Sequence, residues 1–118
     1  MPWGTERYRE AMTLTTEKPL EVVLALLGQR GVYALLRALT AGPLRFGALQ
    51  QVSALPPRTL SLRLKELEEV GLIHRTEYSE VPPRVEYTLT EMGRALKPAL
   101  EALAGWEQGL IAQPRSRL

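Results

Sequence analysis

The spacing of the apolar residues changes once along this chain of 118 residues, directly after Gly71. Before Gly71, apolar residues recur every three or four positions, as they do on one face of a helix. From Leu72 to Leu89 they alternate with polar residues, and Ser79-Glu80-Val81-Pro82-Pro83 interrupts the alternation. Two alternating runs around a proline-bearing turn predict a β-hairpin. The chain is therefore expected to have a helical part followed by a hairpin.

Helices are expected on both sides of the hairpin, because glycines and prolines divide the helical part into short periodic segments. The expected helices before the hairpin cover residues 20–27, 30–40, 44–52 and 57–70. After the hairpin, Thr90 is expected to cap a last helix, with Thr88-x-x-Glu91 as an alternative capping box. Pro98 should kink this helix or divide it in two. A further short helix or arm is expected over residues 3–12.

This order of elements, two helices, a short helix, a longer helix, a hairpin and a helix, is that of a winged helix-turn-helix. The predicted fold is mainly α in the α+β class, with terminal helices that form a dimer. The chain shows no repeat and no linker, so we expect one domain over residues 1–118. Its core should cover about residues 20–92, with dimerisation flanks at 1–19 and 94–112.

The charges are unevenly distributed, although the formal net charge is only +2. Residues 22–65 carry six basic residues and no acid, whereas residues 66–118 carry nine Glu against six basic residues. A long acid-free segment is the electrostatic footprint expected where a polyanion docks. The alternative is that these basic side chains scatter over several faces and only solubilise the protein. The positions of these basic side chains on the helices and strands decide between the two interpretations.

The helix at 57–70 is the candidate for reading DNA. On a helical wheel, Leu64 and Leu67 lie within about 40° of Leu60, so this side should face the core. The opposite face carries basic and small polar residues, which suits a helix that enters the major groove by its first turns. The expected DNA contacts are Arg58, Thr59, Ser61, Leu62 and Lys65 on this helix, Arg45 before the third helix, and Arg75 and Arg84 on the hairpin.

Each of these residue types has its own expected role. Arg58 and Lys65 are expected to reach guanine or phosphate, Ser61 a base edge or phosphate, and Leu62 a thymine methyl group. The alternative for this face is a solvated helix surface with one exposed leucine.

On the hairpin, Arg84 is expected along the phosphate backbone or in the minor groove, and Arg75 on the backbone. The alternative for both is pairing with Glu77, Glu80 or Glu86, and it applies to Arg75 more than to Arg84. Arg45 is expected to make a phosphate contact of low specificity.

The two ends of the chain carry more apolar side chains than one small core needs. We expect them to be buried against a second subunit, because a two-fold dimer reads two half-sites about 34–36 Å apart. The alternative is that both ends pack against their own core. The expected dimer contacts are Trp3, Tyr8, Met12, Leu96, Leu100, Leu103, Trp106 and Leu110.

The missing residue types exclude much chemistry. The chain has no Cys, Asp or Asn and a single His, His74, so thiol chemistry, a structural zinc site and an EF-hand are excluded. There is no glycine-rich phosphate loop either. We therefore expect no enzyme, cofactor or metal, and His74 is interpreted as a strand residue. The longest apolar stretch, Val22 to Leu27, is too short to span a membrane, and we expect a cytoplasmic protein.

Three segments resemble the HxlR family of bacterial and archaeal winged-helix regulators, which are relatives of the MarR type. They are Gly42-Pro43-Leu44-Arg45-Phe46, the stretch from Arg58-Thr59-Leu60-Ser61 to Arg75, and Tyr78-x-Glu80-Val81-Pro82-Pro83-Arg84-Val85-Glu86-Tyr87 with Leu89-Thr90 and Gly93. The resemblance implies a homodimeric transcriptional regulator in which terminal helices form the dimer and the fourth helix reads DNA.

The chain departs from the family pattern at three places. Many members carry Cys-Pro near the first helix, where this chain has Lys18-Pro19, so thiol sensing is ruled out. Members commonly show Gly-Lys-Trp where this chain has Gln29-Arg30-Gly31, which puts local packing in doubt. Pro56-Pro57 replaces the usual polar start of the recognition helix, and neither proline has an N–H to donate to phosphate.

The sequence thus predicts a homodimeric, sequence-specific regulator that binds an inverted-repeat operator in double-stranded DNA. The alternative is a winged-helix protein-interaction module without an operator. A small-molecule sensor of the MarR kind would need an apolar cavity, and the sequence leaves any effector open.

Overall fold

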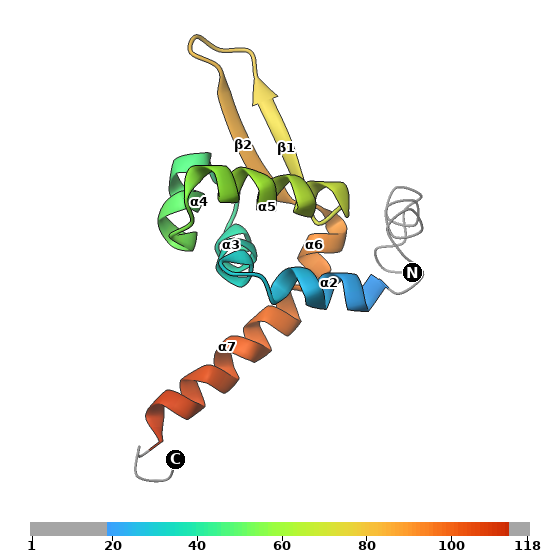
Figure 1. Ribbon diagram of the computed structural model, residues 1–118, viewed down its shortest axis with the longest axis vertical. Coiled ribbons are helices and arrows are strands. Elements are labelled where there is room, and N and C mark those ends of the chain that lie inside the picture. The colour runs from blue at the N-terminus through green and yellow to red at the C-terminus, as the bar shows by residue number, and fades with distance from the viewer. Residues whose placement is uncertain (1–18, 114–118) are drawn as a thin grey trace.

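The computed structural model describes residues 19–113, and it has the predicted order of elements (Figure 1). The fold is mainly helical with one small antiparallel sheet. The helices and strands are α2 (Pro19–Leu27), α3 (Val32–Leu39), α4 (Phe46–Ser53), α5 (Pro57–Glu69), β1 (Ile73–Tyr78), β2 (Arg84–Leu89), α6 (Glu91–Ala95) and α7 (Lys97–Ala112). The expected arm at 3–12 lies outside the described residues.

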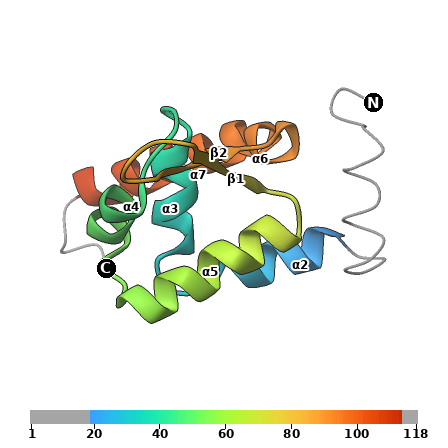
Figure 2. The ribbon, with the colours of Figure 1, turned by 90° about the horizontal axis from the view of Figure 1, so that it is seen from above.

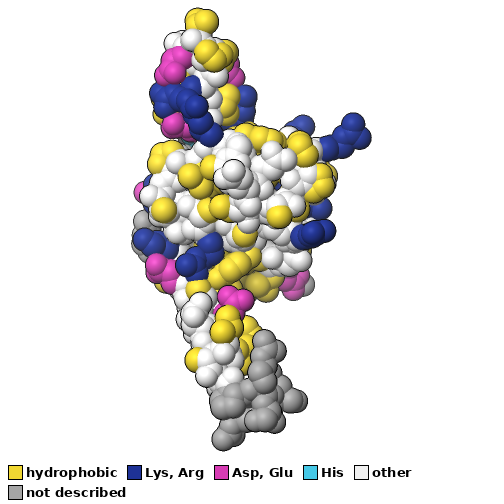
Figure 3. Space-filling model, turned by 90° about the vertical axis from the view of Figure 1, so that its left-hand side faces the viewer, with side chains coloured by type: hydrophobic (Ala, Val, Ile, Leu, Met, Phe, Trp, Pro, Cys, Tyr) yellow, Lys and Arg dark blue, Asp and Glu magenta, His cyan; other side chains and the backbone are white. Residues whose placement is uncertain are grey.

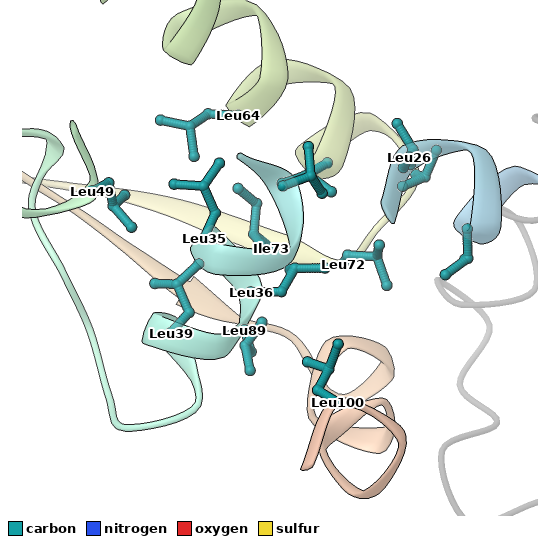
Figure 4. Packing of buried hydrophobic residues seen from close by; sticks show 14 of the residues in the cluster. Leu26, Leu35, Leu36, Leu39, Leu49, Leu64, Leu72, Ile73, Leu89 and Leu100 are labelled. Atoms are coloured by element: carbon teal, nitrogen blue, oxygen red, sulfur yellow. The ribbon is translucent and has the colours of Figure 1, made fainter. Parts of the chain in front are cut away.

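Helix α3 is the centre of the core. Its side chains Val32, Leu35, Leu36 and Leu39 are all buried, and the helix contacts α2, α4, α7 and β2. In Figure 4 leucines from the surrounding elements converge on this helix. Full burial of a leucine contributes about 1.5–3 kcal/mol, so this cluster holds the other elements in place.

Helix α2 forms where predicted. The spacing of Leu20, Val23, Leu24 and Leu27 predicts one apolar face, but the helix buries a different face. Val23 and Leu26 enter the core, whereas Leu20 and Leu24 remain 68% and 56% exposed. The reason is that α2 lies at the edge of the bundle, where its main contact is with α3. Two leucines on its outer side are therefore left facing solvent.

The third helix starts later than predicted because Leu44 is used elsewhere. Its backbone pairs with Tyr87 of β2 in both directions, with N···O distances of 3.0 and 2.8 Å. Helix α4 therefore begins at Phe46. Its buried residues are Leu49 and Ser53. The spacing of Phe46, Leu49 and Val52 predicts one apolar face, but Val52 is 48% exposed. The Leu44–Tyr87 bridge joins the start of α4 to the hairpin.

The hairpin of β1 and β2, called the wing below, is antiparallel with Ile73 opposite Leu89 and Tyr78 opposite Arg84. Thr90 then caps α6, as predicted: its Oγ1 accepts a hydrogen bond from the Gly93 N–H at 3.1 Å and donates one to the Gly71 carbonyl. The capping position is therefore Thr90 and not Thr88.

The last helical segment is divided in two, as one of the expectations for Pro98 stated. Helix α6 ends at Ala95, Leu96 separates the two helices, and Pro98 occupies the first turn of α7. Helix α7 then leaves the body on the side opposite the wing (Figure 1). Among residues 19–113, no single helix is long and apolar enough to cross a membrane; α2 and α3 meet the length and composition criteria only as a pair bent by 102°.

Candidate nucleic-acid interface

The turn between α4 and α5 is fixed by backbone geometry and one serine. Ala54 adopts the left-handed conformation with φ 55°, and its N–H donates to the Gln50 carbonyl at 2.9 Å. The buried Ser53 Oγ accepts the Leu55 N–H at 3.3 Å. Leu55 is itself buried beside Gly31. Gly31 precedes the first residue of α3 and has φ +85°. These contacts set the direction in which α5 leaves the turn.

Helix α5 presents the face that the sequence predicted. Leu60, Leu64 and Leu67 are buried, and Arg58, Ser61, Leu62 and Lys65 are exposed. Leu62 is 50% exposed, and Thr59 is half-buried. Figure 1 shows α5 between the wing and α3, and in Figure 2 it runs along one edge of the molecule. The exposed face is confirmed, and DNA contact by these side chains stays a prediction.

The N-terminus of α5 has no side-chain cap. Pro56 and Pro57 carry no N–H, and the Leu60 N–H is already used by the Pro56 carbonyl at 2.9 Å. Arg58 and Thr59 therefore supply the first amide groups of the helix, at the positive end of its dipole. A backbone contact to phosphate at this helix end would therefore begin at Arg58.

The six basic residues of the acid-free segment do not all gather on one face. The Nη1 of Arg37 lies 3.4 Å from the Tyr33 hydroxyl on α3, and Arg63 pairs with Glu66 at 2.9 Å. Arg45 is exposed at the N-terminus of α4, close to the Leu44–Tyr87 bridge. Arg30 is exposed before α3, so Arg45, Arg58 and Lys65 are the exposed basic residues that remain on α4 and α5.

The wing arginines both make the ion pairs that were the alternative to DNA contact. Arg75 pairs with Glu77 at 3.3 Å, and a hydrogen bond with Tyr87 raises the pKa of its guanidinium. Arg84 pairs with both Glu80 and Glu86, at 2.8 and 2.7 Å. The hydrogen bond to Glu80 is the main cause that raises the pKa of Arg84. The expectation that ion pairing applies to Arg75 more than to Arg84 is therefore wrong, because Arg84 has two carboxylate partners and Arg75 has one.

The Arg84 side chain has another neighbour that sequence reasoning missed. Its guanidinium carbon lies 3.9 Å from the centre of the Tyr78 ring, within the range of a cation–π contact. Tyr78 and Arg84 are directly opposite in the strand register. The contact could therefore have been predicted from the hairpin if its register had been known. Figure 3 shows side chains of both charges on the wing and hydrophobic side chains at its tip.

The expected dimer contacts fall into four groups. The prediction that Leu100 is a dimer contact is wrong, because this side chain is only 1% exposed. Helix α7 is still packed against the body at this point, where the Tyr33 hydroxyl donates to the Leu100 carbonyl at 3.1 Å. Leu96 is half-buried against the core. The others within residues 19–113 are exposed, namely Leu103, Trp106 and Leu110. Trp3, Tyr8 and Met12 lie outside the described residues.

A helix-turn-helix with an exposed, acid-free recognition face and an adjoining β-hairpin defines the winged helix-turn-helix class of DNA-binding regulators. The profile of the HxlR-like helix-turn-helix family matches residues 26–114. The chain belongs to this family, and its relatives are transcriptional regulators.

Two relatives and one solved structure illustrate the similarity. The chain is 40% identical over 89 residues to the HTH-type transcriptional regulator YdeP of Bacillus subtilis (strain 168), covering 75% of this chain and 70% of YdeP. It is 38% identical over 101 residues to the regulator BH0655 of Halalkalibacterium halodurans, covering 84% of this chain and 89% of BH0655. The redox regulator HypR in its reduced form matches with a TM-score of 0.73 and 35% identity, covering 80% of this chain and 94% of HypR.

Proposed function

We propose that the protein is a homodimeric transcriptional regulator that binds an inverted-repeat operator and reads each half-site with α5. The observation that carries this proposal is the exposed face of α5, where Arg58 and Lys65 are basic and residues 57–65 contain no acid. Acids appear on α5 only from Glu66 onward, which is where a helix that enters the major groove by its first turns leaves the DNA.

The side chains on this face divide into two kinds of contact. Arg58 and Lys65 reach guanine or phosphate, and Ser61 and Leu62 lie between them to meet base edges. Arg45 at the N-terminus of α4, with Arg75 on the wing, supplies sequence-independent contacts to the phosphate backbone. A regulator of transcription acts where the chromosome is, so we place the protein in the cytoplasm.

Dimerisation is supported by the apolar surface of α7. Leu103 and Leu110 are spaced by seven residues and Trp106 lies between them, which is the pattern of a helix that packs along another helix. Trp106 is 64% exposed and Leu103 is 47% exposed. Contiguous apolar surface of this kind marks an interaction site, and Leu20 and Leu24 of α2 add further exposed apolar side chains.

DNA recognition is tested by fluorescence anisotropy with the duplex upstream of the protein's own gene and a scrambled duplex, across a salt series. Arg58→Ala and Lys65→Ala should each cost about 1–3 kcal/mol of specific binding if they read a base. Lys97→Ala is the matched control, because it removes the same charge from an exposed position at the start of α7. Unchanged affinity for both α5 variants would reject the recognition face.

If no duplex binds even at low salt, the protein-interaction module becomes the better interpretation, because a phosphate-binding surface must show salt-dependent affinity. Dimerisation is tested separately by analytical ultracentrifugation. Leu103→Glu should give monomers, because it places a charge in the apolar stripe of α7. Leu62→Glu introduces the same charge at a similarly exposed leucine on α5 and should leave the dimer intact. A monomeric parent protein would reject the dimer.

A further inference from the structure

Four side chains on the wing form a closed cluster around Arg84. Glu80 accepts hydrogen bonds from Nε at 3.0 Å and from Nη2 at 2.8 Å, and Glu86 accepts from Nη1 at 2.7 Å. The Tyr78 ring covers one face of the guanidinium. Every nitrogen of Arg84 therefore has a carboxylate partner, and only 27% of the side chain is exposed.

This arrangement opposes a contact between Arg84 and DNA. Phosphate and carboxylate oxygens compete for the same guanidinium donors, so a phosphate must displace Glu80 or Glu86 before Arg84 can bind it. The two glutamates and one arginine also give the cluster a net negative charge, which repels the DNA backbone. Arg84, which the sequence pattern predicts to contact phosphate, is thus already neutralised within its own hairpin.

We propose that Glu80 and Glu86 are positioning residues that hold Arg84 on the wing and away from the phosphate backbone, and so lower the affinity for DNA of every sequence. This inference rests on the proposed function, because it concerns the same DNA-binding surface. The effect is independent of sequence, since a phosphate contact carries no direct information about the bases.

The size of the effect follows from the exposure of the pairs. Partly exposed ion pairs are weak, and each corresponds to a factor of about 1.5 to 5 in an equilibrium constant. Replacing both glutamates by glutamine removes two competitors and two repulsive charges while keeping the size of each side chain. The variant E80Q/E86Q should therefore bind a scrambled duplex about threefold to tenfold more tightly at low salt. The slope of log affinity against log salt should steepen by about one for each Arg84 that gains a phosphate.

The control for overall charge is E68Q/E69Q, which removes two exposed acids from the last part of α5. Its gain should be smaller, and it should not depend on Arg84. The decisive comparison adds R84Q to E80Q/E86Q, because the gain should then disappear. In the parent protein, R84Q alone should change DNA affinity little.

Three outcomes would overturn the inference. The first is a gain that persists when R84Q is added, which would mean that the glutamates act only by general repulsion. The second is a loss of affinity for R84Q alone as large as that for Lys65→Ala, which would mean that Arg84 already contacts DNA. The third is an E80Q/E86Q variant with the parent's affinity and salt slope. If neither the parent nor E80Q/E86Q binds any duplex, the proposed function fails together with this inference.

Discussion

Replacing Gly31 by alanine should destabilise the fold, because two separate costs meet at this position. The backbone of Gly31 has φ +85°, a conformation in which a side chain costs about 1–2 kcal/mol. A Cβ at this position would also lie 2.8 Å from Cδ1 and 2.9 Å from Cγ of Leu55. Leu55 is buried in the turn between α4 and α5, so its side chain can yield only partly, at a further cost of about 1 kcal/mol or more.

The unfolded state returns part of this cost, since alanine restricts the unfolded chain and stabilises by about 0.4–1 kcal/mol. The net loss should be about 2 kcal/mol in the free energy of unfolding. With a urea dependence of about 1–3 kcal/mol per molar, the urea midpoint should fall by about 1 M. The measurement is urea unfolding followed by circular dichroism, at one protein concentration because dimerisation shifts apparent stability.

Gly47→Ala is the matched control. Gly47 lies in α4 with no atom within 4 Å of an added Cβ, so the same substitution should stabilise the protein slightly, by up to about 1 kcal/mol. If Gly31→Ala unfolds at the same urea concentration as the parent protein, the contact between the start of α3 and the helix-turn-helix turn is refuted. Of these two glycines, only Gly31 has a close neighbour. Equal destabilisation by both variants would therefore show that the contact with Leu55 is not the cause of the loss.

Three further predictions concern the cap, the core and the recognition face. Thr90→Ala removes the acceptor for the Gly93 N–H and the donor to the Gly71 carbonyl; a thermal scan should show a loss of about 1–2 kcal/mol, whereas Thr90→Ser should retain most of the stability. Leu100→Ala should lower the free energy of unfolding by about 2–5 kcal/mol in chemical denaturation, while Leu103→Ala should weaken chiefly self-association in sedimentation. The opposite pattern would show that the core does not end between Leu100 and Leu103 on α7. If Leu62 meets a thymine methyl group, replacing one dT of the operator by dU should weaken binding by the parent protein about threefold to fourfold, as expected for one buried methyl group. The same replacement should leave the affinity of the Leu62→Ala variant unchanged. Equal losses of affinity in both proteins would exclude that role.

The recognition helix could be predicted because its determinants are local. Leu60, Leu64 and Leu67 define the buried side by their spacing alone, and Gly71 follows the end of the helix with φ +87°. The exposed face then follows from helix geometry. The cap at Thr90 and the division of the last helix at Pro98 were equally local, and both were read from single residues.

The remaining features depend on contacts between segments that are far apart in the sequence. The Leu44–Tyr87 bridge shortened α4 at its start, and no periodicity within residues 44–52 reports a partner on β2. Leu100 and Leu103 lie on the same apolar stripe of α7, but only Leu100 is near enough to α3 to be buried. Periodicity gives the side of a helix that is apolar; it does not give the point at which the helix leaves its own core.

That departure of α7 from the body makes the helix a lever. Its attachment near Leu100 is also an attachment to α3, which contacts α4 in turn. The part of α7 beyond Leu100 runs to Ala112 and is about 18 Å long, so a tilt of about 10° at the attachment moves its far end by about 3 Å. This displacement is close to the rise of one base pair, about 3.4 Å. In a dimer joined through α7, small changes where this helix meets α3 would thus be converted into whole base pairs of separation between the two half-sites.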